Sequence, residues 1–262
     1  MAAKGEILSF LAKAASSASH LPLHHSPSPP FHTSLSRHKE HSCELVEVAE
    51  DGLLSFKIFA VNDAEGLVRS SELLCRRFAW RGYSVPPLQE RRRRRITLSA
   101  LHEGRVVATL TVGLDGTEGL SVESVYSDCV GELRSPERRL CEFTKFAVDE
   151  TVRSQVLLGA IFHVACMYAL QLHDCTDALI EVNPRHVRFY ERMLGFSRAA
   201  EQRLDTRVNA PAVLMRLDLQ HSAREIDRLA SGPECQSKER SCYSSFFRPA
   251  TAEAVLQRLR MH

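Results

Sequence analysis

The sequence lacks the features that mark several common protein classes. It has 8 cysteines in 262 residues but no Cys-x-x-Cys pair, so we expect neither a zinc ribbon nor a dense disulfide framework. A net charge of only +2 argues against a chain that binds polyanions as a whole. The most apolar stretch, residues 156–172, is shorter than the ~20 residues that span a bilayer. His163 lies in its middle, which favours a buried helix over an integral membrane segment.

No secretory signal is evident either. The first twenty residues, MAAKGEILSFLAKAASSASH, contain too short an apolar run for a signal peptide. Together with the unpaired cysteines, this favours a cytoplasmic protein with reduced thiols. Residues 1–42 are rich in Ser, Pro and His and show no periodicity, which predicts a disordered tail.

Strand and helix patterns alternate through residues 43–220. A His-Glu-Gly turn at 102–104 predicts a hairpin, and Asn62 or Asp63 could cap the helix that precedes it. The predicted elements are a strand at 53–61, a helix at 64–80, the hairpin at 96–114, a helix at 121–135, a strand at 138–149, helices at 156–172 and 184–194 around a strand at 178–182, and a last strand at 210–219. This order predicts an α/β fold with a mixed central sheet and helices on both faces. Residues 221–262 are predicted to form a helical extension.

One stretch, IEVNPRHVRFYERMLGF at 180–196, contains residues typical of the start and end of a helix. Asn183 can cap a helix through its side-chain oxygen, and Pro184 suits the first helical turn, where an N–H is not needed. Gly195 then supplies the left-handed residue that often ends a helix. The stretch is therefore a strand, a cap, a helix and a glycine stop.

This stretch resembles the late strand–helix motif of the GCN5-related N-acetyltransferases, in which an Asn precedes a helix that bears a Tyr. Together with RRLCEFTKFAVD, RVNAPAVLMRLDL and GLDGTEGLSVESVYSDCVGELR, it more closely resembles the long-chain N-acyl amino acid synthases of the FeeM type, which are relatives of the acyl-homoserine lactone synthases. The resemblance covers residues 53–219. It implies the acyl-CoA N-acyltransferase (GNAT) fold and transfer of an acyl group from a thioester to the amine of an amino acid.

The resemblance leaves the acyl donor open between acyl carrier protein and coenzyme A. Coenzyme A-dependent relatives cradle the pyrophosphate in a glycine-rich loop at a helix start, where backbone N–H groups meet negative charge. Here the corresponding stretch is VRSQVLLGAIF, which keeps Gly159 but has Leu and Val in the preceding turn. Because the cradle is incomplete, we favour acyl carrier protein as the partner. The acyl thioester is then a co-substrate, and no tightly bound cofactor or metal is expected.

Glu142 is the candidate general base, because it lies in an apolar strand where desolvation would raise its pKa. The alternative is that it only pairs with Arg138 or Lys145. Glu142 and Lys145 are three positions apart, so a regular strand would point them to opposite faces. One bulge residue would bring both to the same face, and the acyltransferase fold that the resemblance implies has a bulge on this strand, which also frees a backbone N–H for the thioester oxygen. We therefore predict a β-bulge between Glu142 and Val148. The substrate-binding residues predicted on this strand are Thr144, Lys145, Phe146, Ala147 and Val148.

The other candidates come from the helices. Tyr190 could protonate the departing thiolate or simply be a core residue, and Asn183 would bond the pantetheine arm. Arg185 could contact an acidic carrier protein, as could the run of arginines at 91–95, although such a run is more often a solvated loop. Arg77 and Tyr83 are candidates for the substrate carboxylate.

Two other readings remain open at this stage. The chain could be an acetyl-coenzyme A-dependent small-molecule N-acetyltransferase, or a non-catalytic module that binds acyl chains or carrier proteins. A nucleic-acid partner is not predicted, because no aromatic residues interleave with the basic run. The apolar residues that could line an acyl slot would serve equally well as core: Phe143, Phe146, Phe162 and Met167.

Overall fold

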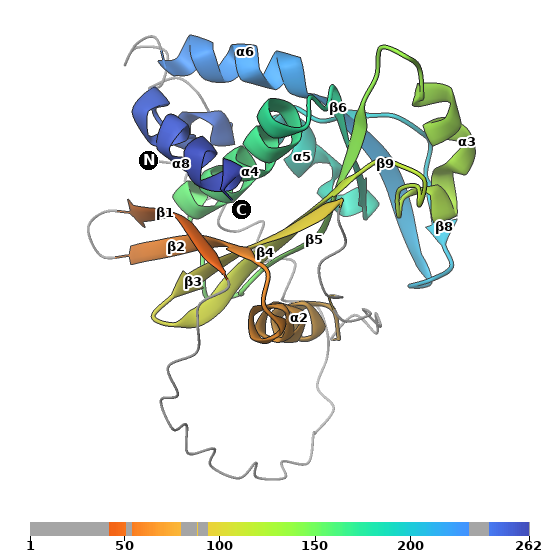
Figure 1. The fold of residues 1–262 in the computed structure, drawn as a ribbon. Helices are drawn as coiled ribbons and strands as arrows, with labels where there is room; N and C mark the ends of the chain where they lie inside the picture. Colours follow the sequence, from red (N-terminus) through yellow and green to blue (C-terminus); the bar gives the residue numbers. More distant parts are fainter. Residues whose placement is uncertain (1–41, 51–53, 80–87, 89–93, 231–240, 262) are drawn as a thin grey trace, which may run out of the picture.

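A computed structural model describes residues 42–50, 54–79, 88, 94–230 and 241–261. Their strands form one sheet in the order β1-β2-β3-β4-β5-β6-β9-β7, with β8 beside β9 (Figure 1). Only β5 and β6 run parallel. The strands are β1 Cys43–Glu50, β2 Leu54–Val61, β3 Arg95–His102, β4 Arg105–Leu114, β5 Leu140–Val148, β6 Asp177–Val182, β7 Ser197–Arg198, β8 Arg203–Asp205 and β9 Ala210–Asp218. The tail predicted at 1–42 lies outside the described residues except for its last residue.

Helices cover both faces of this sheet, as predicted. One face carries α4, α5, α6 and α8, and the other carries α2 (Figure 1). The helix α3 lies on the α2 side over β5, β6 and β9. It packs on Leu140 and Leu179, and the adjacent residues Cys141 and Ala178 pack on the α4 side. Since adjacent strand residues face opposite sides of a sheet, α3 is on the side away from α4. The helices are α2 Ala64–Ala79, α3 Glu123–Leu133, α4 Gln155–Cys166, α5 Val187–Leu194, α6 Leu219–Ala230 and α8 Pro249–Arg260.

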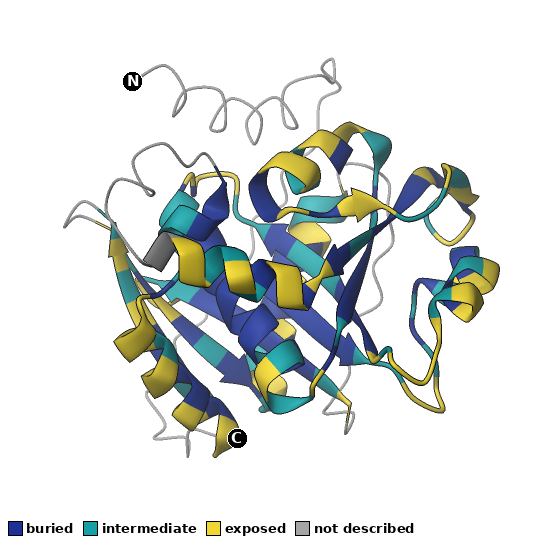
Figure 2. Cartoon of the chain, turned by 90° about the horizontal axis from the view of Figure 1, so that it is seen from above, coloured by how far each residue is buried: buried dark blue, intermediate teal, exposed yellow. Residues whose placement is uncertain are grey.

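The core lies between the sheet and α4 (Figure 2). Every residue of α4 from Leu157 to Cys166 is buried. A helix that is enclosed on all sides needs no polar face, and this explains why apolar residues occur all around α4. The stretch Gln155–Leu172 is long and apolar enough to cross a membrane by length and composition alone, but 67% of it is buried inside the protein. Burial against the sheet accounts for its hydropathy.

Two helix predictions need correction in their details. The helix predicted at 156–172 leaves the α-helical pattern after Cys166 and continues as a π-helical turn, η1, at Met167–Leu172. The helix predicted at 184–194 starts as a 3-10 turn, η2, at Pro184–His186 before α5 begins. The predicted cap and stop are confirmed: the Asn183 side chain accepts a hydrogen bond from the backbone N–H of Arg185, and Gly195 has a φ of +73°.

Sequence analysis missed the strand β1 and its contact with α8. β1 pairs antiparallel with β2, and α8 packs on β1, where the Arg258 guanidinium donates to the carbonyl of Leu45 at 2.7 Å. A short 3-10 turn, η3 (Cys242–Ser245), lies against α4. Gly159 of α4 permits this approach, because a Cβ there would lie 2.8 Å from the Cβ of Ser245. The C-terminal segment is therefore part of the core packing.

Candidate active site

The parallel strands β5 and β6 separate halfway along their length. Their pairing runs from Leu140–Asp177 to Glu142–Leu179 and then stops, although β5 continues to Val148 and β6 to Val182. The remaining edges of the two strands therefore face an opening in the sheet. Backbone N–H and C=O groups at such an edge can bond an extended ligand in place of a strand.

The bulge predicted between Glu142 and Val148 is confirmed. Thr144 pairs with Thr111 and Ala147 with Thr109, so Lys145 and Phe146 together oppose the single residue Leu110. Lys145 has a φ of +52°, a backbone conformation that side chains other than glycine seldom adopt. Strain of this kind clusters at functional sites. The bulge also shifts the alternation, since Phe143 and Phe146, three positions apart, both lie against Phe162.

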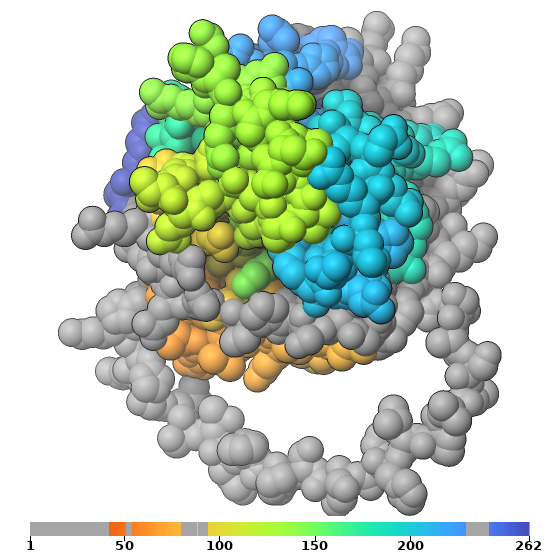
Figure 3. Space-filling model, turned by 90° about the vertical axis from the view of Figure 1, so that its right-hand side faces the viewer, coloured from red at the N-terminus to blue at the C-terminus, as the bar shows by residue number. Residues whose placement is uncertain are grey.

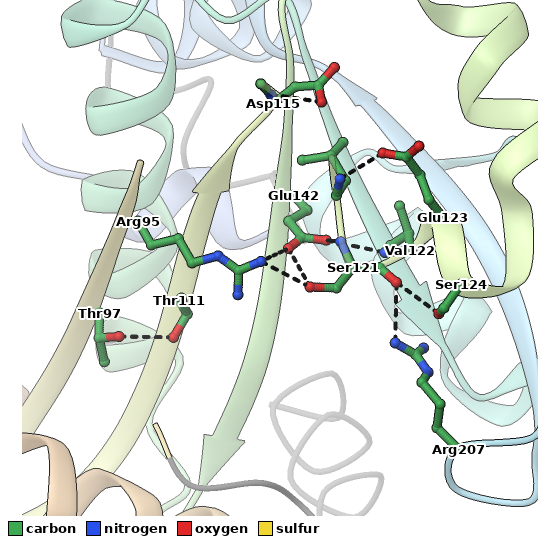
Figure 4. A network of polar contacts seen from close by, with 12 residues as sticks. Arg95, Thr97, Thr111, Asp115, Ser121, Val122, Glu123, Ser124, Glu142 and Arg207 are labelled. Atoms are coloured by element: carbon green, nitrogen blue, oxygen red, sulfur yellow. Dashed lines mark hydrogen bonds and ion pairs between the residues drawn. The ribbon is translucent and has the colours of Figure 1, made fainter. Parts of the chain in front are cut away.

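Glu142 is fully buried beside this opening and is held by four donors (Figure 4). One carboxylate oxygen accepts from the backbone N–H groups of Ser121, at 2.7 Å, and Val122, at 3.3 Å. The other accepts from the Ser121 hydroxyl at 2.7 Å and from Arg95 at 3.4 Å. These bonds fill the roughly four acceptor positions of a carboxylate. Its role as the base stays a prediction, and its partner is Arg95, where sequence analysis offered Arg138 or Lys145.

The neighbours of Glu142 explain how it reaches its place. Gly113 of β4 pairs with Glu142, and a Cβ at Gly113 would come within 3.1 Å of the Glu142 side chain. Arg95 is the last residue of the arginine run and the first of β3, and its side chain is 29% exposed. The interpretation of the run as a solvated loop is thus wrong for Arg95, which turns towards a buried carboxylate. Of the rest of the run, only Arg94 lies within the described residues.

The sheet surface between α2 and this carboxylate is buried yet polar. Thr97 and Thr111 share a hydrogen bond at 3.0 Å, and Ser99 bonds Ser70 of α2 at 2.6 Å. Thr109 is fully buried, and its hydroxyl has no hydrogen-bond partner among the described residues. Burying a hydroxyl in this way costs free energy, so its place on β4, one strand from the opening, indicates a surface shaped to meet polar groups.

A second polar cluster lies on the β6 side of the opening. Glu181 of β6 accepts a hydrogen bond from Arg207 at 2.9 Å, and Arg207 also bonds both oxygens of Asp205 at 2.9 Å. The same guanidinium donates to the backbone carbonyl of Ser121 at 3.1 Å, as Figure 4 shows. Burial raises the pKa of Glu181 to about 7, and the hydrogen bond with Asp205 adds to this rise against the opposing charge of Arg207.

The remaining predicted residues lie around these two clusters. Asn183 ends β6 at the opening, and its amide also bonds the carbonyl of Pro211 at 3.4 Å. Tyr190 is half-buried against Phe196, and burial raises the pKa of its phenol, which keeps the proton on. Arg185 is exposed at the start of the η2–α5 segment. Their roles stay predictions.

Arg77 bonds Glu150 at 3.1 Å, and Tyr83 lies outside the described residues. Ala147 packs towards α2 with Leu73 and Leu74, whereas Val148 lies against the core on the α4 side. Phe143, Phe162 and Met167 are buried in that core, which confirms their alternative reading as core residues. Figure 3 shows part of the β5 region at the floor of a hollow bordered by the α3 and β8 regions.

The loop between β5 and α4 uses its own hydrogen-bond donors. The backbone N–H of Thr151 donates to the Asp149 carboxylate at 3.1 Å, and that of Leu157 donates to the Ser154 hydroxyl at 2.9 Å. Asp149 and Glu150 also bring two carboxylates to the loop, which ion-pair with Arg76 and Arg77. A pyrophosphate at this helix start would meet fewer available N–H groups than helix starts usually offer.

Several solved structures are similar to this chain. FeeM, an N-acyl amino acid synthase from uncultured soil microbes, matches with a TM-score of 0.58 and 21% identity over 67% of this chain and 96% of its own. The acyl-homoserine lactone synthase LasI matches with a TM-score of 0.48 and 16% identity over 63% and 90% of the two chains. An acyl-CoA N-acyltransferase from Pseudomonas aeruginosa gives 0.42 and 16% over 62% and 98%. The chain has the N-acyltransferase fold.

The family follows from the sequence itself. The profile of the family described as N-acyl amino acid synthase FeeM matches residues 69–218, which is more than half of the chain, and the chain belongs to this family. No curated protein matches it significantly. The protein is thus an acyltransferase, and the resemblance stated from its motifs is confirmed.

Sequence reasoning missed Ser121, Arg95, Glu181 and Arg207. Each comes from a segment far from Glu142 in the chain. Ser121, Glu181 and Arg207 lie within stretches that carry the family resemblance, but no pattern within those stretches marked them as site residues. One signal was present: Glu181 is a carboxylate within the short buried strand ALIEV, the same pattern that singled out Glu142.

Proposed function

We propose that this protein transfers a long-chain acyl group from an acyl carrier protein thioester to the amine of an amino acid, giving an N-acyl amino acid. The observation that carries the proposal is the opening between β5 and β6 beside the bulge at Lys145 and Phe146. A pantetheine arm is extended and rich in amide groups, so it can bond the free strand edges. The thioester carbonyl would then meet the backbone of the bulge, where an N–H can stabilise the oxyanion.

The face of the sheet towards α2 and α3 suits the acceptor. A free amino acid carries an ammonium and a carboxylate, and the buried Thr and Ser hydroxyls, Arg95 and the two glutamates offer partners for both. The apolar chain of the donor would lie on the other side of the bulge, towards half-buried Phe146. The two substrates would approach the bulge from opposite faces of the sheet.

The loop before α4 supports the carrier protein as donor. Thr151 and Leu157 have already given their N–H groups to side chains of the chain itself, and a carrier-bound pantetheine has no pyrophosphate that would need them. Exposed arginines along the neighbouring η2–α5 segment could meet the acidic surface of a carrier protein: Arg185, Arg188 and Arg192.

A donor comparison tests this proposal. The purified chain is given dodecanoyl-carrier protein, dodecanoyl-coenzyme A or dodecanoyl-pantetheine with the twenty standard amino acids, and N-acyl products are measured by mass spectrometry. We expect every active donor to give N-dodecanoyl amino acids. The carrier-protein thioester should have a kcat/KM at least about tenfold higher than the other two donors, because docking adds binding energy of ~1.4 kcal/mol or more. Equal or better use of coenzyme A would contradict the carrier-protein donor, and the absence of any product would contradict the function.

A charge reversal sharpens the docking part. Arg188→Glu on α5 should lower kcat/KM for the carrier protein by about tenfold and leave dodecanoyl-pantetheine unchanged, because only the carrier protein has an acidic surface. Arg224→Glu on α6 changes the same charge at another exposed arginine and is the matched control. Equal losses with both variants would indicate a general charge effect and no docking site on α5.

A further inference from the structure

We propose that Glu181 accepts the proton of the attacking amine, directly or through one water molecule, and that Glu142 positions the loop beside it. This assignment rests on the proposed function. It follows from a comparison of the two carboxylates that flank the opening, one on β5 and one on β6.

Both glutamates lie on the same face of the sheet. Leu140 and Leu179, one strand repeat away from Glu142 and Glu181 respectively, pack together under α3. Glu142 belongs to the last pair that joins β5 to β6, and Glu181 follows two residues beyond the end of that pairing. Glu181 therefore lies on the part of β6 that borders the opening, on the side proposed for the acceptor.

The two carboxylates differ in what already binds them. Glu142 accepts four hydrogen bonds and its side chain has no exposed surface, so an amine would have to displace a donor to reach it. Glu181 accepts one N–H hydrogen bond in the described part of the chain, from Arg207, and 15% of its side chain is exposed. Glu181 thus has an acceptor position to offer and a path to solvent.

The groups around Glu181 favour its work as a base. Asp205 of β8 and Arg207 bond it directly, and Tyr126 of α3 lies near enough for the charge of Glu181 to help burial raise the pKa of its phenol. The pKa of Glu181 is raised to about 7, whereas that of Asp205 is lowered, since its bonds from Arg207 outweigh its burial. Two neighbouring carboxyls separated in this way usually divide the acid and base roles between them.

The connection to Glu142 runs through two residues. Arg207 bonds Glu181 at one end of its guanidinium. At the other end it bonds the carbonyl of Ser121, and Ser121 bonds Glu142 through its N–H and its hydroxyl (Figure 4). Glu142 is thereby a positioning residue: it fixes Ser121, which fixes Arg207, which orients Glu181.

The proton and electron pairs balance as follows. An ammonium of the amino acid gives one proton to the Glu181 carboxylate, and the freed nitrogen lone pair forms a bond to the thioester carbonyl carbon. The carbon–sulfur bond then breaks, and its electron pair leaves with sulfur, which takes up the second proton lost by the nitrogen. Glu181 returns its proton to solvent. The products are an amide, a thiol and one proton.

The pH dependence of Glu181→Gln tests the assignment, with dodecanoyl-pantetheine and the amino acid that gives most product in the donor comparison. If Glu181 deprotonates the ammonium, wild-type kcat/KM rises with pH and levels off above about pH 7, because the protonated amine is then a competent substrate. Glu181→Gln should lose about 10²- to 10⁴-fold at pH 7 and keep rising beyond pH 8, since only free amine then reacts.

Asp205→Asn provides a second variant that keeps Glu181 and removes a hydrogen bond that raises its pKa. Its kcat/KM should level off at a lower pH than the wild type. A uniform loss in Glu181→Gln with an unchanged profile shape would overturn the assignment and leave the proposed function standing, as would an unshifted profile in Asp205→Asn. A wild-type chain that forms no N-acyl product would overturn the proposed function and this assignment with it.

Discussion

The two faces of the central sheet differ sharply near the opening. On the α4 face, the buried residues are almost all apolar, and Phe162, Ile161 and Cys141 are typical. On the α2 and α3 face, β3, β4 and β5 bury Thr97, Ser99 and Thr109, followed by the carboxylate of Glu142. A buried polar group costs free energy unless it is bonded, and on this face the Thr109 hydroxyl has no partner among the described residues. The polarity of this face indicates that it serves substrate and the first serves the fold.

The strands themselves show the same division along their length. β5 and β6 pair at Leu140–Glu142 and then separate. Lys145, which lies beyond the last pair, has the unusual backbone conformation. Rigid pairing at one end therefore fixes the width of the opening at the other. The substitutions below probe each face in turn.

The largest effect is expected on the apolar face. Phe162→Ala removes a ring that is 1% exposed and makes a tilted contact with Phe143 and an edge-to-face contact with Phe146, so the free energy of unfolding should fall by about 3–5 kcal/mol. Urea unfolding followed by circular dichroism measures the change. Val68→Ala, at a site on α2 that is 56% exposed, is the control and should stay within about 0.5 kcal/mol. A loss below ~1 kcal/mol at Phe162 would contradict tight packing on this face.

A smaller loss, with a different character, is expected from Glu142→Gln on the polar face. The amide group would turn N–H donors towards the N–H groups of Ser121 and Val122, and Arg95 would lose its ion pair. Unfolding free energy should fall by about 2–3 kcal/mol, because bonds to a buried charge are lost. Activity should fall at every pH, while the pH at which kcat/KM levels off stays that of the wild type.

Glu132→Gln on the exposed side of α3 is the matched control for that change and should alter neither quantity. If Glu142→Gln instead abolishes the levelling above pH 7 and leaves stability intact, Glu142 is the base. The position of the two carboxylates on one face would then hold, but their roles would be exchanged.

Local patterns were enough to predict most of the fold. The cap at Asn183, the stop at Gly195 and the turn at 102–104 each depend on a few adjacent residues, and all are present. The bulge after Glu142 is also present, and the family resemblance was needed to predict it. β1 was missed although CELVEVAE alternates partly, because strand pairing with β2 decides it and pairing is not a local property. The π-helical end of the apolar helix has no local signal in the sequence that we can name.

The site was less predictable for the same reason. Glu142, Tyr190 and Asn183 could be found because family motifs carry them. Arg95 and Ser121 lie 47 and 21 positions from Glu142, and only the folded sheet brings them to its carboxylate. Arg95 shows the limit clearly: within the sequence it ends a basic run, and of the two described residues of that run it is the one bonded to Glu142.

The last and smallest effect concerns stability and pH, and it can separate Glu181 from an ordinary carboxylate. The pKa of Glu181 is raised from 4.5 to about 7 in the folded chain, so folding binds a proton between these values. Stability from this group is therefore complete below pH 4.5 and is lost as the pH rises through about 7, which is opposite in sign to a carboxylate in a simple salt bridge. The full rise would correspond to roughly 3 kcal/mol, and the Arg207 ion pair and partial exposure reduce our expectation to about 1–2 kcal/mol.

Glu181→Gln has no such proton to lose, so it should match the wild type near pH 5 and exceed its unfolding free energy near pH 8. Urea titrations at the two pH values measure the difference, and a variant that is less stable than the wild type at pH 8 would mean that the Arg207 ion pair outweighs burial, leaving Glu181 ionised and too weak a base for the role proposed.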